Sequence, residues 1–281
     1  MRVASLVLCL LVGLTACNTG PRPIAIITAM PAELAAVLTF TDVTETRTID
    51  GHIYRLGTIG GRRVVVTMTS IGLVNARTIT TALLAHFDVA GIVFSGVAGS
   101  RYNIGDVTVP DTWTLRADGS SYPVDADWLA LSRGLVGAPD VVLDRCTPRL
   151  ADPTMNVCMP QMPTVVVGGV GLSADPFGRG AFFCEADNND VYGCDIGGPA
   201  PRPPTFTLPA DPMPPVAIDQ ETAAVARVAQ MRGVRFIAFR GVSDGMGDPL
   251  MLPGFPGQFY AYYRLASHNA AVAAVRFLGR L

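Results

Sequence analysis

The sequence contains only 3 histidines, no block of basic residues and no internal repeat. Its 21 lysine and arginine residues are scattered rather than grouped with interleaved aromatic residues, so we expect no nucleic-acid partner. The missing repeat excludes solenoid and propeller folds. We expect neither a cofactor nor a metal ion.

The remaining composition is that of an ordinary core-forming protein. The chain has 281 residues, of which 49% are apolar and 16% charged, with a formal net charge of -2. This length suits one large α/β domain or two small ones.

The first 17 residues have the features of an export signal. One positive charge follows Met1, and an apolar run from Val3 to Leu14 is too short for a membrane-spanning helix, which favours a signal peptide. The sequence LTAC resembles the bacterial lipobox, in which the cysteine is lipidated; an ordinary signal peptide with an incidental cysteine is the alternative. We therefore expect residues 1–17 to be a signal peptide and Cys17 a lipid anchor. The exported protein would lie in the periplasm or at the cell surface, with this anchor as its contact with the membrane.

Removal of Cys9 with the signal and lipidation of Cys17 would leave an even number of cysteines. The four that remain are Cys146, Cys158, Cys184 and Cys194. An exported protein can form disulfides, and three pairings are possible. We favour Cys146–Cys158 and Cys184–Cys194, because each pair closes a short loop. A zinc site is the competing interpretation, but no histidine lies near these cysteines and their spacings are not of the CxxC kind.

Short apolar runs typical of buried strands alternate with helical spacing along most of the chain. Strands are expected at residues 23–27, 52–58, 62–69, 90–94, 106–110, 164–170, 216–221 and 236–239, and helices from about residue 31 and at 73–87, 222–232 and 259–278. Residues 111–162 are polar and turn-rich, and residues 178–214 read as an insertion tied by a disulfide. The alternation predicts one domain, residues 18–281, in three α/β/α layers with a central, mostly parallel, twisted sheet.

Acidic and hydroxyl side chains follow several of these strands. The strand at 236–239 leads into Ser243 and Asp244. Ligands of open α/β sheets bind at the carboxyl ends of strands, so Asp244 is the first catalytic candidate, although it could instead cap a turn. Glu33 lies in the first turn of a helix, where complementing the helix dipole would also explain it. Ser70 is a third residue at a strand end.

Five motifs occur in an order that resembles the nucleoside phosphorylase and nucleosidase superfamily. They are TAMPAE, TSIGLVNA, FSGVAGS followed by NIGDV, AIDQETAAVA and RGVSD. The likeness is greatest to the methylthioadenosine/S-adenosylhomocysteine nucleosidases and covers residues 24–110 and 164–280. This resemblance implies a nucleoside phosphorylase-like fold, hydrolysis of the bond between a purine and ribose, and a homodimer.

The resemblance also implies roles for individual residues. Glu33 corresponds to the glutamate that activates water, Asp244 to the aspartate that protonates the leaving purine, and Ser243 to the serine that positions this aspartate. The implied substrate contacts are Glu221 with Gln220 at the ribose hydroxyls, Ser70 and Gly99 at the sugar and water, Phe177 at the base, and Met30 and Tyr262 at the 5′ substituent. Asp244 would have to be protonated while Glu33 stays ionised, which different burial of two carboxyls can achieve.

The choice between hydrolase and phosphorylase depends on the phosphate site. Phosphorylases of the superfamily place an arginine just before the glycine loop, where this chain has Phe94. An apolar Phe94 and an acidic Glu33 would repel phosphate, so water is the expected nucleophile and a purine nucleoside phosphorylase is the alternative. A non-catalytic nucleoside-binding or storage protein could share the fold, but the joint presence of Glu33, Glu221 and Asp244 argues against it.

Overall fold

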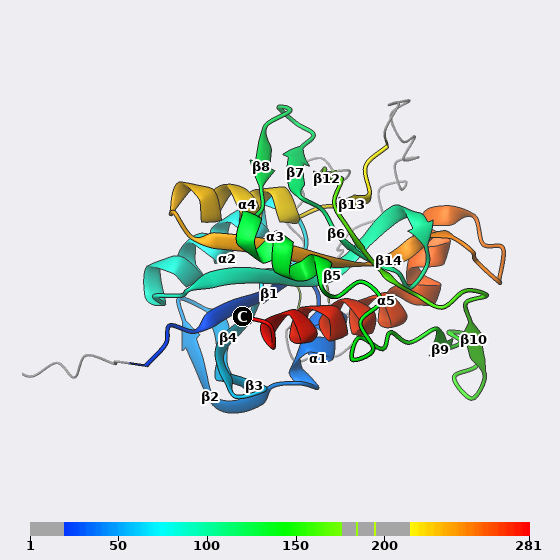
Figure 1. The fold of residues 1–281 in the computed structure, drawn as a ribbon, viewed down its shortest axis with the longest axis horizontal. Helices are drawn as coiled ribbons and strands as arrows, with labels where there is room; N and C mark the ends of the chain where they lie inside the picture. The colour runs from blue at the N-terminus through cyan, green and yellow to red at the C-terminus, as the bar shows by residue number, and fades with distance from the viewer. Residues whose placement is uncertain (1–19, 176–183, 185–193, 195–213) are drawn as a thin grey trace, which may run out of the picture.

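The computed structural model describes residues 20–175, Cys184, Cys194 and residues 214–281 (Figure 1). The expected signal peptide with its lipid anchor Cys17, Phe177, and the expected insertion apart from Cys184, Cys194 and Pro214 lie outside the described residues.

One mixed sheet forms the centre of the fold, which confirms the predicted α/β class. Its strands in the described residues are β1 (Ile24–Thr28), β2 (Asp42–Ile49), β3 (His52–Ile59), β4 (Arg62–Met68), β5 (Gly91–Asn103), β6 (Val107–Val109), β7 (Thr112–Leu115), β8 (Ser121–Pro123), β11 (Val165–Val167), β12 (Val170–Ser173), β13 (Ala217–Asp219) and β14 (Arg235–Met246). A separate hairpin consists of β9 (Cys146–Pro148) and β10 (Asn156–Cys158).

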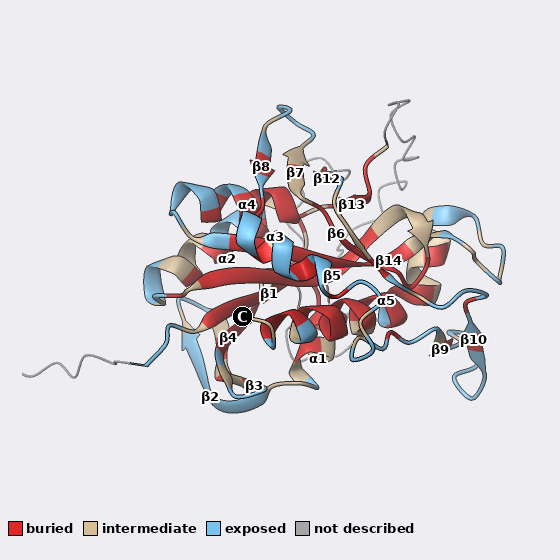
Figure 2. Cartoon of the chain, viewed as in Figure 1, coloured by how far each residue is buried: buried red, intermediate tan, exposed pale blue. Residues whose placement is uncertain are grey.

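Helices cover both faces of the sheet (Figure 1). They are α1 (Pro31–Leu38), α2 (Leu73–His86), α3 (Ala126–Arg133), α4 (Thr222–Met231) and α5 (Gly254–Leu278). One hydrophobic cluster joins α1, α3 and α5 to the sheet, and a second joins α2 and α4 to it. Alternate residues of β1 enter the two clusters, Ile24 and Ile26 the first and Ala25 and Ile27 the second, as the two-residue period of a strand requires. Figure 2 shows the resulting buried centre with exposed helix faces outside it.

The order of the strands brings distant parts of the chain to one edge. Strand β5 pairs in parallel with β1 on one side and with β14 on the other, so their carboxyl ends point the same way. Strand β13 pairs antiparallel with β5 at a single register position, Ile218 opposite Gly99. The loops after β1, β4, β13 and β14 therefore meet beside the second half of β5.

The main differences from the sequence-based prediction lie in polar segments. Strand β2 was not expected, because its residues are exposed on both faces and so show no apolar alternation; it is held by antiparallel pairing with β3. The segment 111–162, expected to be turn-rich, contains β7, β8, α3 and the β9–β10 hairpin. Each of these elements is short, which leaves little periodicity to detect.

Both disulfides favoured from the sequence are present, Cys146–Cys158 and Cys184–Cys194. The first ties β9 to β10. Within the part of the chain that the structure describes, no helix is long and apolar enough to cross a membrane.

Candidate active site

Glu33 is buried at the start of α1, with 2% of its surface exposed. Its Oε2 accepts hydrogen bonds from the backbone N–H groups of Ala29 (2.6 Å) and Met30 (3.2 Å), and its Oε1 accepts one from Val97 (2.8 Å). Pro31 occupies the first position of the helix, where a backbone N–H would have no partner within the helix, so the N–H that proline lacks is not missed. Burial raises the pKa of Glu33 above its ordinary value, and Arg240 and these three N–H donors oppose the rise.

Arg240 is a buried cation at the centre of the same region. Its Nη2 lies 3.1 Å from Asp219 Oδ2 and 3.2 Å from Glu221 Oε2, and its guanidinium lies 4.6 Å above the ring of Phe94. Its Nε and Nη1 have no hydrogen-bond partner among the described residues. Two nitrogen atoms of a fully buried guanidinium, with three N–H donors between them, are thus left for a ligand or water, because unpaired buried donors are costly.

Glu33 and Arg240 converge on Gly96 in the small-residue loop of β5. A Cβ at Gly96 would lie 2.4 Å from Arg240 Nη1 and 2.7 Å from Glu33 Oε1. Only glycine therefore lets both side chains approach the strand this closely. The close approach of these two side chains is therefore a specific reason for glycine at position 96, which could not be seen in the sequence.

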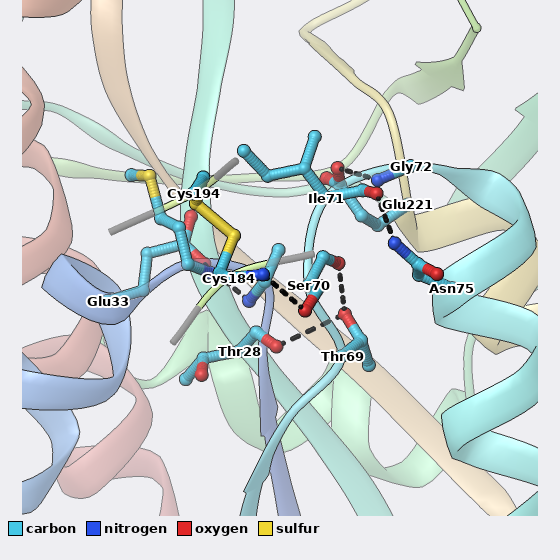
Figure 3. Close-up of a disulfide and its surroundings, with 12 residues drawn as sticks. Thr28, Glu33, Thr69, Ser70, Ile71, Gly72, Asn75, Cys184, Cys194 and Glu221 are labelled. Carbon is cyan, nitrogen blue, oxygen red and sulfur yellow. Dashed lines mark hydrogen bonds between the residues drawn. A yellow bond between two sulfur atoms is a disulfide. The ribbon is translucent and has the colours of Figure 1, made fainter. Parts of the chain in front are cut away.

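Glu221 joins this cluster from the start of α4. Its Oε1 accepts a hydrogen bond from Gly72 N–H (3.0 Å), which ties it to the loop after β4 (Figure 3). Burial, reinforced by the charge of Asp219, raises the pKa of Glu221 to about 8. Asp219 is itself held by Ser173 and Thr222 hydroxyl donors. Three carboxylates therefore surround one guanidinium.

Asp244 lies where the pairing of β14 with β5 becomes irregular. Ser243 Oγ donates to its Oδ1 (2.7 Å), and a Cβ at Gly99 would lie 2.4 Å from its Oδ2. Burial raises the pKa of Asp244, and the hydrogen bond from Ser243 opposes the rise. The next residue is fixed by Gln258, whose Oε1 accepts the N–H of Gly245 (2.9 Å).

The structure also describes the surroundings of three other predicted substrate contacts, Ser70, Gln220 and Met30. Ser70 has a φ of 67°, a region that residues other than glycine rarely adopt, and its Oγ accepts a hydrogen bond from Cys184 N–H (3.0 Å). Gln220 is half-buried next to Glu221. Met30 packs in one apolar cluster with Tyr263 and Cys194.

Tyr262, predicted beside Met30, is placed elsewhere by the structure. It lies in a different cluster with Leu265, and its hydroxyl donates to Asp248. Tyr263 is the tyrosine that shares a cluster with Met30. Adjacent residues of a helix point in directions about 100° apart, so a position one residue away faces another neighbour.

Sequence reasoning missed Arg240 and Asp219. The available signal was an arginine at the end of the apolar run FIAF, since a charge there must be buried and paired. Among the described residues, no group of three or more His, Cys, Asp or Glu side chains is arranged to hold a metal ion.

Comparisons with known proteins identify a family and several relatives. The sequence model of the phosphorylase superfamily matches residues 23–178. The chain is 37% identical over 186 residues to the uncharacterized protein Rv2293c of Mycobacterium tuberculosis, which covers 59% of this chain and 74% of that protein. It is 27% identical over 263 residues to the 5′-methylthioadenosine/S-adenosylhomocysteine nucleosidase of Listeria innocua, which covers 91% of this chain and 98% of the relative.

A solved structure shows the same fold. The 5′-methylthioadenosine/S-adenosylhomocysteine nucleosidase of Colwellia psychrerythraea, in complex with adenine, matches with a TM-score of 0.65 at 20% identity. The match covers 93% of this chain and 96% of that chain.

Proposed function

Because the chain belongs to the phosphorylase superfamily, whose related proteins point to a glycosidic-bond hydrolase or phosphorylase type of enzyme, we propose that it is a purine nucleosidase. It would hydrolyse the N-glycosidic bond of a nucleoside of the methylthioadenosine/S-adenosylhomocysteine type. Water would be the nucleophile, and free ribose derivative and purine base would be the products.

The observation that carries this proposal is the set of hydrogen bonds that the Glu33 carboxylate accepts. Its carboxylate accepts three backbone N–H groups, from Ala29, Met30 and Val97. Backbone N–H groups at a helix start and a glycine loop are donors of the kind that bind phosphate. Here a side chain of the protein already uses them, and its own charge repels a second anion. This supports water rather than phosphate as the co-substrate.

Water activation would fall to Glu33 and Arg240 together. Both reach the same glycine, so a water molecule there can donate to the Glu33 carboxylate and accept from the unpartnered Arg240 Nη1. The raised pKa of Glu33 makes it a stronger base than an exposed glutamate once it is ionised. The water would lose its proton to Glu33 as its oxygen attacks the anomeric carbon.

The leaving purine would be protonated by Asp244. Its raised pKa favours the protonated form, and the hydrogen bond from Ser243 to Oδ1 leaves Oδ2 to carry the proton toward the base. An ionised Glu221 would accept hydrogen bonds from the ribose hydroxyls. When ionised, the three carboxylates around the one guanidinium of Arg240 would give the site an excess of negative charge, which would stabilise the positive charge that develops on the sugar.

The test is release of free base from methylthioadenosine, adenosine and inosine by the mature protein, with and without phosphate. Release with a free ribose product in phosphate-free buffer is expected. Strict dependence on phosphate would instead establish a phosphorylase, and binding without any release would establish a binding or storage protein.

Two variants test the assigned residues. Glu33→Gln and Asp244→Asn should each lose turnover, by about 10²–10⁴-fold for one general acid or base, while most of the ligand affinity remains. Glu45→Gln, which removes an exposed carboxylate on β2, is the matched control and should be fully active. Full activity in the Glu33 or Asp244 variant would remove that residue from the mechanism.

A further inference from the structure

The Cys184–Cys194 disulfide lies against the candidate active site. Cys184 N–H donates to Ser70 Oγ (3.0 Å), on the loop that also holds Glu221 through Gly72. Cys194 is 5% exposed and belongs to the same apolar cluster as Met30, whose backbone N–H is bound by Glu33. In the view of Figure 3 the disulfide is drawn between Glu33 and Ser70. The cross-link therefore connects to the loops of both Glu33 and Glu221.

The surroundings of the disulfide are apolar. Its cluster contains the buried residues Met30, Ala32, Val97, Tyr263 and Ala266, with Ile71, Phe259 and Tyr260 packed against them. These residues come from the loop after β1, from α1, β5 and α5, and from the loop after β4. Cys194 is itself a buried member of this cluster, and Cys184 packs against it.

We propose that the Cys184–Cys194 disulfide is a specificity-determining wall at the sugar end of the site, which admits purine nucleosides with a short 5′ substituent and excludes those with a long, charged one. This inference rests on the proposed nucleosidase function. With the base at Asp244 and the ribose hydroxyls at Glu221, the part of the nucleoside left to meet Met30 and the disulfide is the 5′ end.

Two physical effects would produce this selectivity. A long substituent would have to occupy the space of a covalent cross-link, which cannot swing aside as a flexible side chain can. A charged amino-acid tail would also be brought against apolar surface without partners, and burial of unpaired charges is costly. A methylthio group is small, apolar and subject to neither effect. Methylthioadenosine should thus be accepted and S-adenosylhomocysteine rejected.

The chain provides a matched control for the experiment. Cys184→Ser/Cys194→Ser removes the cross-link at the site, and Cys146→Ser/Cys158→Ser removes one of similar span in the β9–β10 hairpin, the sequence separations being 10 and 12 residues. The measurement is kcat/KM for base release from methylthioadenosine and from S-adenosylhomocysteine, in phosphate-free buffer, for the wild type and both double variants.

The wild type should prefer methylthioadenosine by about tenfold or more. The Cys184/Cys194 variant should gain kcat/KM on S-adenosylhomocysteine, so that the preference falls by about tenfold, and the hairpin variant should keep the wild-type preference. Misfolding cannot produce such a gain. A wild type that cleaves both nucleosides equally, or a preference unchanged in the Cys184/Cys194 variant, would overturn the wall while leaving the nucleosidase intact. A wild type that releases no base from any nucleoside would overturn the proposed function itself.

Discussion

Substitution of Asp219 by Asn should shift the pH dependence of the enzyme. Asp219 Oδ2 and Glu221 Oε2 lie 3.1 Å and 3.2 Å from the same Arg240 nitrogen, so they can be at most about 6 Å apart. Two negative charges at ~6 Å and an effective dielectric constant of about 20 repel each other by ~3 kcal/mol. That repulsion corresponds to about 2 pH units in the titration of Glu221.

The raised pKa of Glu221 determines the direction in which the pH profile should move. The pKa of Glu221 is raised to about 8, so in the wild type this carboxylate forms only as the pH rises toward that value. In Asp219→Asn the same group should ionise near pH 6, about 2 units lower. If ribose binding needs the ionised form, the acid limb of kcat/KM should move from near pH 8 to near pH 6. The same substitution removes the ion pair between Asp219 and Arg240, so the maximum value of kcat/KM should also fall.

The assay is kcat/KM for base release between pH 5 and 9. Ser173→Ala removes a hydroxyl that donates to Asp219 but keeps the charge, so its acid limb should stay near that of the wild type. An acid limb that does not move in Asp219→Asn, with Glu33 and Arg240 intact, would show that Glu221 is not the group that limits activity. Repulsion between Asp219 and Glu221 would then not set the pH dependence of activity.

Three further predictions concern Gly99, Gln258 and the N-terminus. Gly99→Ala places a Cβ 2.4 Å from Asp244 Oδ2, so kcat should fall by about 100-fold with little change in Tm, and normal kcat would show that Asp244 tolerates displacement. Gln258→Leu removes the acceptor of the Gly245 N–H, and the unpaired N–H should lower the free energy of unfolding by about 1–3 kcal/mol in urea denaturation; unchanged stability would mean that water replaces it. Cys17→Ala should move the exported protein from the detergent phase to the aqueous phase on Triton X-114 partition, and an unchanged distribution would refute the lipid anchor.

The parts of the fold that the sequence predicted are those that depend on neighbouring residues in the chain. The apolar runs of β1, β5 and β14 and the loops that follow them were identifiable because buried parallel strands have a distinctive composition. The same logic found Glu33, Ser243 and Asp244, which lie within a few residues of strand ends. Local patterns therefore identified these three residues of the candidate site.

The relations that the sequence could not predict are those between distant segments. The pairing of Arg240 with Asp219 depends on the approach of β13 to β5, which no residue pattern within either strand announces. The hydrogen bond from Cys184 to Ser70 joins residues 114 positions apart. Which of Tyr262 and Tyr263 lies beside Met30 depends on the rotation of α5 about its axis. A shift of one residue rotates a side chain by about 100° and so changes its neighbours.

The position of β14 has a consequence for the order in which the protein can acquire activity. The last strand of the chain lies inside the sheet, paired with β5 on one side and with β6 on the other. Until it inserts, the long edge of β5 is open and both Arg240 and Asp244 are absent from the site. A partly synthesised chain would thus lack both of these side chains, and its final 50 or so residues, rather than its first, would complete the proposed site.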